Sequence, residues 1–263
     1  MPIDNLQRFY RRYYQPDNAM LIIAGQFDPE KALEYANAHF GIIPRPDRQL
    51  ENTYTEEPAQ DGARTVRLQR VGDVAMVGAL YHIPAGPHPD YVPIDVLEHV
   101  LTATPSGRLY KRLVATRQAS SVSGSAYSLH DPGVLKLSAQ VTPGNDPEAV
   151  LSTLLDVAEN IREQPVSNEE VDRAKVYWMK VWEQAFTDSA RLAVQLSDWA
   201  AQGDWRLIFL YRDRLEAVTA AQVNDVANKY LTENNRTAGL FIPTEAAQPH
   251  LGAAHAFDRR TRR

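Results

Sequence analysis

The 263 residues, of which 44% are hydrophobic and 23% charged, are enough to bury one large core or two smaller ones. The formal net charge of -5 gives no electrostatic reason to expect a nucleic-acid partner, and no apolar run approaches the about 20 residues that span a bilayer. The absence of cysteine excludes disulfides, thiolate nucleophiles and Cys-ligated zinc. The composition is that of a globular protein, and it leaves the cellular compartment open.

The first 41 residues predict a helix, a strand and a second helix. Asp4 is placed to cap a helix that ends at Pro16, because its apolar residues recur at helical spacing. Residues 19–24 are a continuous apolar run and predict a buried strand that Gly25 stops. Asp28, followed by proline, predicts the start of the second helix, which closes at Gly41.

The middle of the chain predicts four strands with helices between them. Residues 44–62 are rich in proline and charge and predict an extended surface crossing, followed by strands at 63–70 and 74–82, the second covered on both faces. Residues 90–102 predict a helix, and Ser106 begins a short helix that presents Leu109 and Leu113. A hairpin of residues 120–129 and 134–141 turns at an Asp-Pro-Gly sequence.

The last third of the chain predicts mainly helices. One begins at Asp146, and a capping box of Ser167 and Glu170 opens a long helix with a single gap in its apolar spacing that ends at Gly203. Helices at 205–217 and after the capping box of Thr219 and Gln222 follow, then a strand at 236–242. Residues 246–263 predict a flexible tail.

Strands in hairpins, with helices between and after them, favour an α+β fold over a doubly wound parallel sheet. We expect two layers, with a mostly antiparallel sheet of five or six strands and helices packed on one face. We expect one domain over residues 1–245 and the flexible tail after it.

One constellation stands out, because P-loops, dinucleotide-binding glycines, G-x-S-x-G elbows and zinc-finger spacings are all missing from the sequence. Asp95, Glu98 and His99 lie on the expected helix 90–102 and read as H-x-x-E-H with the first histidine replaced by aspartate. Residues at i and i+4 project from one helical face, so two histidines there hold zinc while the glutamate polarises its water. Asp95 and His99 form a poorer pair, and solvated or half-buried side chains explain all three residues equally well.

Several stretches of the sequence carry a family resemblance. Three of them are residues 9–19 (FYRRYYQPDNA), 25–30 (GQFDPE) and 40–44 (FGIIP). They resemble the beginning of the second domain of a half in the pitrilysin/insulinase (inverzincin) family of zinc metallopeptidases. Residues 106–111 (SGRLYK) resemble its Arg-Leu stretch, and residues 166–175 resemble the start of a later helix. The resemblance extends over about residues 3–243.

The resemblance implies a non-catalytic, peptidase-like domain made by duplication of a ferredoxin-related α+β unit. In the family only the first domain of a half carries H-x-x-E-H and a later glutamate ligand, so zinc belongs to the parent's catalytic domain and none is expected in this chain. Asp95, Glu98 and His99 then form a vestigial motif, with no catalytic or metal-binding residue here. Three glutamates lie in a loosely suitable range for the third ligand, although capping and solvent exposure explain them equally well: Glu169, Glu170 and Glu183.

The family's other half uses an arginine and a tyrosine to hold the substrate or the reacting carbonyl. The corresponding positions are Val114 and Ser121, within a few residues, so this pair is missing as well. The expected role is to help form a proteolytic chamber and bind peptide. The expected partners are a catalytic H-x-x-E-H domain, in the same polypeptide or a sister subunit, and a peptide substrate that adds as a strand to a sheet edge. Periplasmic and exported parents are both compatible with the chain.

Two other functions remain open from the residues. One is a structural core subunit of the kind found in respiratory complexes, which also resembles these peptidases and has no peptidase partner. The other is a weak metal-dependent hydrolase that uses Asp95, His99 and a distant glutamate.

Overall fold

The computed structural model describes residues 2–50 and 58–244, and the expected tail at 246–263 lies outside these ranges. The described residues form an α+β fold, as the sequence predicts. The first elements are α1 (Ile3–Tyr13), η1 (Pro16–Asn18), α2 (Pro29–Phe40), β1 (Arg64–Val71), β2 (Met76–Ile83), α3 (Tyr91–Thr102), the π-helical turn η2 (Tyr110–Val114), β3 (Ala119–Ala126) and β4 (Gly133–Val141). The later elements are α4 (Pro147–Glu159), η3 (Asn160–Arg162), α5 (Asn168–Ala185), α6 (Ser189–Ala201), α7 (Leu207–Ala217), α8 (Ala220–Tyr230), η4 (Glu233–Asn235) and β5 (Arg236–Thr244).

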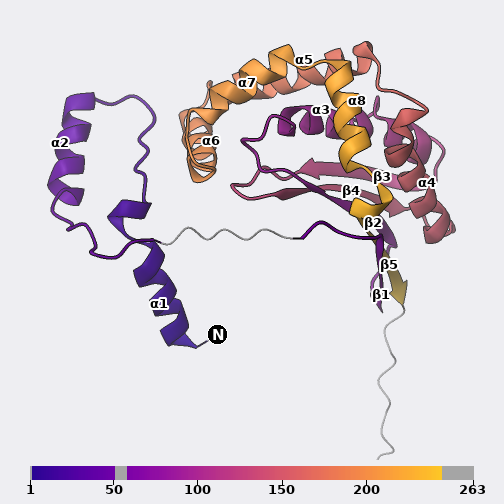
Figure 1. Ribbon diagram of the computed structural model, residues 1–263, viewed down its shortest axis with the longest axis horizontal. Coiled ribbons are helices and arrows are strands. Elements are labelled where there is room, and N and C mark those ends of the chain that lie inside the picture. Colours follow the sequence, from indigo (N-terminus) through magenta and orange to yellow (C-terminus); the bar gives the residue numbers. More distant parts are fainter. Residues whose placement is uncertain (1, 51–57, 245–263) are drawn as a thin grey trace, which may run out of the picture.

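The five strands form one open sheet in the order β1-β5-β2-β4-β3. Three of the four strand pairs are antiparallel, and only β1 and β5 run parallel. The helices that follow β2 gather over one face of this sheet (Figure 1). The expectation of a mostly antiparallel sheet with helices on one face is therefore confirmed.

The core lies between the sheet and these helices. Along β2 every second side chain is buried, including Val77, Ala79 and Tyr81, while Met76 and Leu80 on the other face are exposed. The expectation that this strand is covered on both faces is wrong for the described residues. A strand buried on one face alternates in this way because its side chains point to opposite sides of the sheet.

The expected long helix from Ser167 to Gly203 is also wrong, because it divides into α5 and α6. The Asp188 carboxylate accepts hydrogen bonds from the backbone N–H groups of Ala190 and Arg191, at 2.9 and 3.2 Å. Such a side chain satisfies the free donors of a new helix start. The break falls in the gap of the apolar spacing.

Residues 2–50 form no part of the sheet or of the core beneath its helices (Figure 1), and within this segment Gly25 comes close to Ser189 at the start of α6. Helices α1 and α2 form as expected, although α1 follows Pro2 and lacks a side-chain cap, so Asp4 only adds negative charge to its first turn. No side chain of residues 2–50 is buried. The expected buried strand at 19–24 is wrong for this structure, because the segment is extended and no described strand pairs with it. One core thus unites the later described residues, and the first 50 contribute no buried side chain to it.

Candidate functional site

Helix α3 carries the motif that the sequence singled out, and its side chains face different surroundings. Asp95 is only 7% exposed and accepts a hydrogen bond from the Tyr211 hydroxyl of α7. Burial raises the pKa of the Asp95 carboxyl to about 7, although the Tyr211 bond acts in the opposite direction. The Tyr211 hydroxyl binds Oδ2 of this carboxylate, and the other oxygen, Oδ1, has no hydrogen bond to a described residue.

Glu98 is buried against the sheet. Its carboxylate accepts a hydrogen bond of 2.5 Å from Thr102 Oγ1, one helical turn later, and burial raises its pKa. A Cβ at Gly124 on β3 would collide with the Glu98 carboxylate, so the glycine makes the room that this side chain occupies. Glu98 therefore faces β3, and its bond to Thr102 stays within α3.

His99 packs against aromatic side chains of α5. Its ring stacks on Tyr177 at a centroid distance of 4.2 Å and lies 6.1 Å from Trp178. Burial lowers the pKa of the imidazole, which favours the neutral ring. Asp95 and His99 line two separate hollows, and Trp178 lines both. The i, i+4 spacing is present, but the two side chains are not directed at one point.

The three glutamates that the sequence left as third-ligand candidates serve elsewhere or lie exposed. Glu170 caps α5 with Ser167 and holds the Arg108 guanidinium through two bonds of 2.8 and 2.7 Å. Burial opposes ionisation of Glu170, but the Arg108 and Ser167 hydrogen bonds outweigh it and bring the pKa to about 2. Glu169 and Glu183 are exposed on α5. Within residues 2–50 and 58–244, no three His, Cys, Asp or Glu side chains lie together as a metal-binding group.

The positions that correspond to the family's substrate-holding arginine and tyrosine carry neither function. Val114 ends η2 and packs at the edge of the core, and Ser121 is exposed on β3 with its hydroxyl 3.4 Å from Gln140 Oε1. Neither side chain supplies a guanidinium or a phenol. The sequence did not reveal Tyr211 or Trp178 as neighbours of the motif, because both come from helices distant in the chain.

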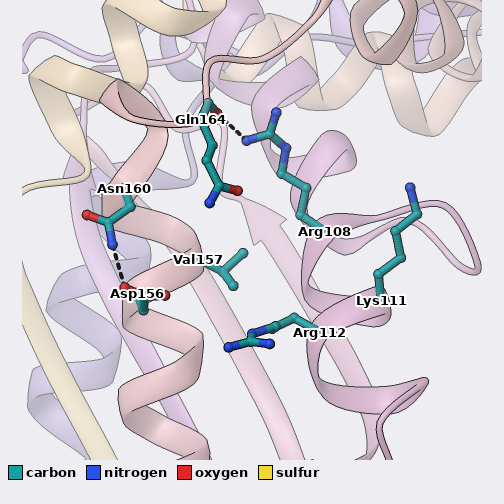
Figure 2. Close-up of a pocket in the computed structure, with 7 residues that line it drawn as sticks. All are labelled: Arg108, Lys111, Arg112, Asp156, Val157, Asn160 and Gln164. Atoms are coloured by element: carbon teal, nitrogen blue, oxygen red, sulfur yellow. Dashed lines mark hydrogen bonds between the residues drawn. The ribbon is translucent and has the colours of Figure 1, made fainter.

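A third hollow, of about 590 Å³, lies between η2 and helix α4, and basic residues form one of its walls (Figure 2). Figure 2 shows Arg108 reaching toward Gln164 and Arg112 pointing toward the helix that carries Asp156, while Lys111 stands at the outer side of the same wall. Arg108 donates to the backbone carbonyl of Gln164 at 2.5 Å, in addition to its bonds with Glu170. In all, four hydrogen bonds tie the Arg108 guanidinium to Glu170 and to the carbonyls of Gln164 and Pro165, so this residue fastens the segment before η2 to the start of α5.

The sheet face opposite the helices is open and apolar. It forms a shallow hollow of about 510 Å³ whose exposed or half-buried side chains come from the three strands at one side of the sheet: Val66, Leu68, Met76, Leu80 and Phe241. Exposed apolar surface of this extent is typical of interaction sites. We call these five residues the open sheet face.

Comparison with known proteins identifies the family. The family model for the Peptidase M16 inactive domain matches residues 1–176. The chain belongs to this family. A solved inactive peptidase domain from Bordetella parapertussis is 42% identical, with a TM-score of 0.64, and the match covers 70% of this chain and 98% of that one. The recognition of a non-catalytic domain of the pitrilysin/insulinase type is confirmed.

Two matches to Helicobacter pylori proteins extend over most of this M16 domain. The zinc protease PqqE of that organism is 26% identical over 244 residues, which are 92% of this chain and 55% of PqqE. A solved protease structure from the same organism has a TM-score of 0.86 at 25% identity, covering 92% of this chain and 60% of that one. The chain spans little more than half the length of these relatives. None of the helices in the described ranges is long and apolar enough to cross a membrane.

Proposed function

We propose that this inactive M16 domain forms one wall of a proteolytic chamber whose catalytic zinc is held by a separate H-x-x-E-H domain, in the same polypeptide or in a sister subunit. The observation that supports this role most directly is the open sheet face, which exposes apolar side chains on the side of the sheet that no described helix covers. A partner domain and an unfolded peptide are the kinds of molecule that bind such a surface.

Strand β3 offers a second element for peptide binding. It is an edge strand of the sheet, and apart from Val122 its side chains are all serine, alanine or glycine. Small side chains leave the backbone groups of an edge strand accessible, and an added peptide strand gains its affinity from such groups. Peptide would therefore lie along β3.

The surroundings of Asp95 and His99 support the absence of catalysis within this domain. A zinc ion would need Asp95 to leave Tyr211 and His99 to leave Tyr177, and a third ligand would have to come from outside the described cluster. We therefore propose that the motif is vestigial and that the zinc of the whole protein lies elsewhere.

The test compares this chain with the protein of its whole reading frame, each purified without added metal. The chain alone is expected to contain no stoichiometric zinc by mass spectrometry and to show no chelator-sensitive cleavage of a quenched peptide library, whereas the longer protein shows both. Stoichiometric zinc together with chelator-sensitive cleavage by the chain alone would overturn the proposal.

A pair of matched variants tests the open sheet face. In the longer protein, Leu80→Asp is expected to lower kcat/KM for peptides by at least about tenfold, which corresponds to about 1.4 kcal/mol of lost transition-state stabilisation. Val176→Asp places the same charge on an exposed apolar position of α5 and is expected to leave kcat/KM unchanged. If the two variants change kcat/KM equally, the open sheet face has no specific role in peptide cleavage.

A further inference from the structure

The hollow that Asp95 lines has walls of aromatic side chains from three helices. Its volume is about 510 Å³, which is typical of ligand sites. Three of the four tryptophans of the chain line it, Trp178 and Trp182 from α5 and Trp199 from α6. Tyr211 from α7 lines it as well, with its ring centroid 5.6 Å from that of Trp199. We call the site formed by these four rings and Asp95 the tryptophan hollow.

Asp95 gives the tryptophan hollow a buried carboxylate that has no cation beside it. While Oδ2 accepts the bond from Tyr211, Oδ1 is left as an acceptor without a partner among the described residues. No lysine or arginine of the described ranges lines the hollow, and the imidazole that does, His130, is exposed with its Nδ1 3.0 Å from Asp131. A buried carboxylate without a counter-charge destabilises a folded chain, so the domain keeps at this place a group that lowers its stability.

Two other shielded carboxylates of the domain show how Asp95 differs. Glu159 accepts two bonds from Arg236, at 2.6 and 2.7 Å, and its charge is balanced within the chain. Glu98 has no arginine, but it lines a different hollow and Thr102 binds it. Only the Asp95 carboxylate lies in the tryptophan hollow while it is buried and offers an oxygen without a partner. Buried groups whose pKa is shifted in this way, inside a cleft, are frequent at binding sites.

Aromatic rings beside a carboxylate attract organic cations. The faces of tryptophan and tyrosine rings are electronegative, and they attract an ammonium or guanidinium group within about 6 Å of the ring centroid. Trp182 already shows this attraction, because the guanidinium carbon of Arg212, which does not line the hollow, lies 5.2 Å from its ring centroid. The exposed carboxylate of Asp198 adds a second negative charge to the lining. The chemistry of the tryptophan hollow therefore selects a cation with an alkyl stem.

The end of strand β3 forms part of the rim of the tryptophan hollow. Ala126 is the last residue of β3, Ser128 and Leu129 follow it, and all three line the hollow. The Ser128 hydroxyl donates to Gln202 Oε1 at 2.6 Å, which joins this rim to the end of α6. A peptide that lies along the edge strand β3 therefore reaches the hollow at this end of the strand.

We infer that the tryptophan hollow binds the side chain of a lysine or arginine residue of a peptide. The aromatic rings attract the cation, Oδ1 of Asp95 accepts a hydrogen bond from it, and the alkyl stem packs against the rings. The inference rests on the proposed function, since it names the class of peptide that the domain holds. Peptides with a basic residue are then preferred over neutral ones.

Calorimetric titration of this chain at pH 8, where Asp95 with its pKa of about 7 is ionised, measures the binding. The probes are capped peptides with lysine, arginine or glutamine between glycines, and n-butylammonium as the lysine cation without a peptide. The lysine and arginine peptides are expected to bind at least about tenfold more tightly than the glutamine peptide and n-butylammonium. Equal binding of the three peptides would overturn the inference. Equal binding of n-butylammonium and the lysine peptide would also overturn it, because the site would then be one for free cations.

Matched substitutions test the role of single side chains. Asp95→Asn keeps the shape of the side chain and an oxygen for Tyr211, and it is expected to weaken binding of the lysine peptide at least about tenfold. Glu98→Gln removes the neighbouring buried carboxylate of α3 outside the tryptophan hollow and is expected to leave the affinity unchanged. Trp199→Leu is expected to weaken binding, whereas Trp205→Leu, outside the lining, is not. An Asp95→Asn chain that binds the lysine peptide as tightly as the original chain would overturn the inference.

Peptide cleavage by the protein of the whole reading frame separates this inference from the proposed function. If this chain binds basic peptides through Asp95 and the longer protein shows no zinc-dependent cleavage, the proposed function alone is refuted. If the longer protein cleaves peptides with zinc and this chain does not prefer the basic peptides, the present inference alone is refuted.

Discussion

Replacement of the buried Asp95 by asparagine is expected to make the protein more stable at neutral and alkaline pH. In the folded chain burial brings the pKa of this carboxyl to about 7, from an ordinary value of 3.8. The folded state therefore keeps a proton that the unfolded chain releases between these two values. Stability is lost as the pH rises from about 4 to about 7, and the loss is complete above the folded pKa.

The size of the effect follows from the two pKa values. Each pKa unit corresponds to 1.36 kcal/mol, so a difference of about three units destabilises the folded chain by about 4 kcal/mol at pH 8. At pH 5 less than half of this cost is present, because Asp95 is still protonated in the folded state and only the unfolded chain is ionised. More than half of the cost therefore appears between pH 5 and pH 8. The asparagine amide never ionises, and it still offers an oxygen to the Tyr211 hydroxyl.

Urea unfolding followed by tryptophan fluorescence at pH 5 and pH 8 measures both quantities. Asp95→Asn is expected to gain several kcal/mol over the original chain at pH 8 and much less at pH 5. Asp198→Asn, at an exposed carboxylate that lines the same hollow, is the matched control and is expected to change little at either pH. Two results together would refute the reasoning: the original chain is equally stable at pH 5 and pH 8, and Asp95→Asn leaves the free energy of unfolding at pH 8 unchanged.

Three further predictions concern the rest of the domain, and urea titration at pH 7 measures each of them. Arg108→Gln is expected to cost about 1–3 kcal/mol, because Glu170 loses a bidentate cation, and Arg108→Lys is expected to recover only part of it; equal stability of all three proteins would contradict this. Leu97→Ala truncates a fully buried side chain of α3 and is expected to cost about 2–5 kcal/mol, whereas Leu210→Ala at an exposed position costs less than about 1 kcal/mol. His99→Ala removes one stacked ring and is expected to cost less than about 1 kcal/mol. Made in the longer protein, the same substitution is expected to leave the zinc content by mass spectrometry unchanged, and a loss of zinc there would argue against a vestigial motif.

The elements that could be predicted from the sequence are those whose signals are local. The capping boxes at Ser167 and Thr219 form as expected, because each needs only four consecutive residues. The break at Asp188 left a signal in the sequence, the single gap in the apolar spacing, but the helical spacing on both sides of this gap favours one continuous helix. The apolar run at 19–24 has the composition of a strand, and the sequence therefore predicts one. A strand forms only where neighbouring strands supply hydrogen bonds, and no described strand does so here.

The candidate site shows the same division. The spacing of Asp95 and His99 on one helix could be read from the sequence, since it depends only on the helical repeat. Their actual neighbours could not, because Tyr211 belongs to α7 and Tyr177 to α5, and only the packing of those helices on α3 brings the rings together. Because aspartate stands at position 95 in place of the first histidine of H-x-x-E-H, the sequence predicts a weakened zinc site. That the Tyr211 hydroxyl binds Asp95 is visible only in the structure.

The position of β5 has a consequence for how the chain is made on the ribosome. This strand separates β1 from β2 in the sheet, yet its residues are among the last described ones to be synthesised. Until residues 236–244 emerge, β1 has no neighbour to pair with among the described strands, and its backbone N–H and C=O groups stay without strand partners. The sheet can therefore form completely only after residues 236–244 have been synthesised, and a protein truncated before β5 would be an open three-stranded sheet with a detached strand, a species prone to aggregation.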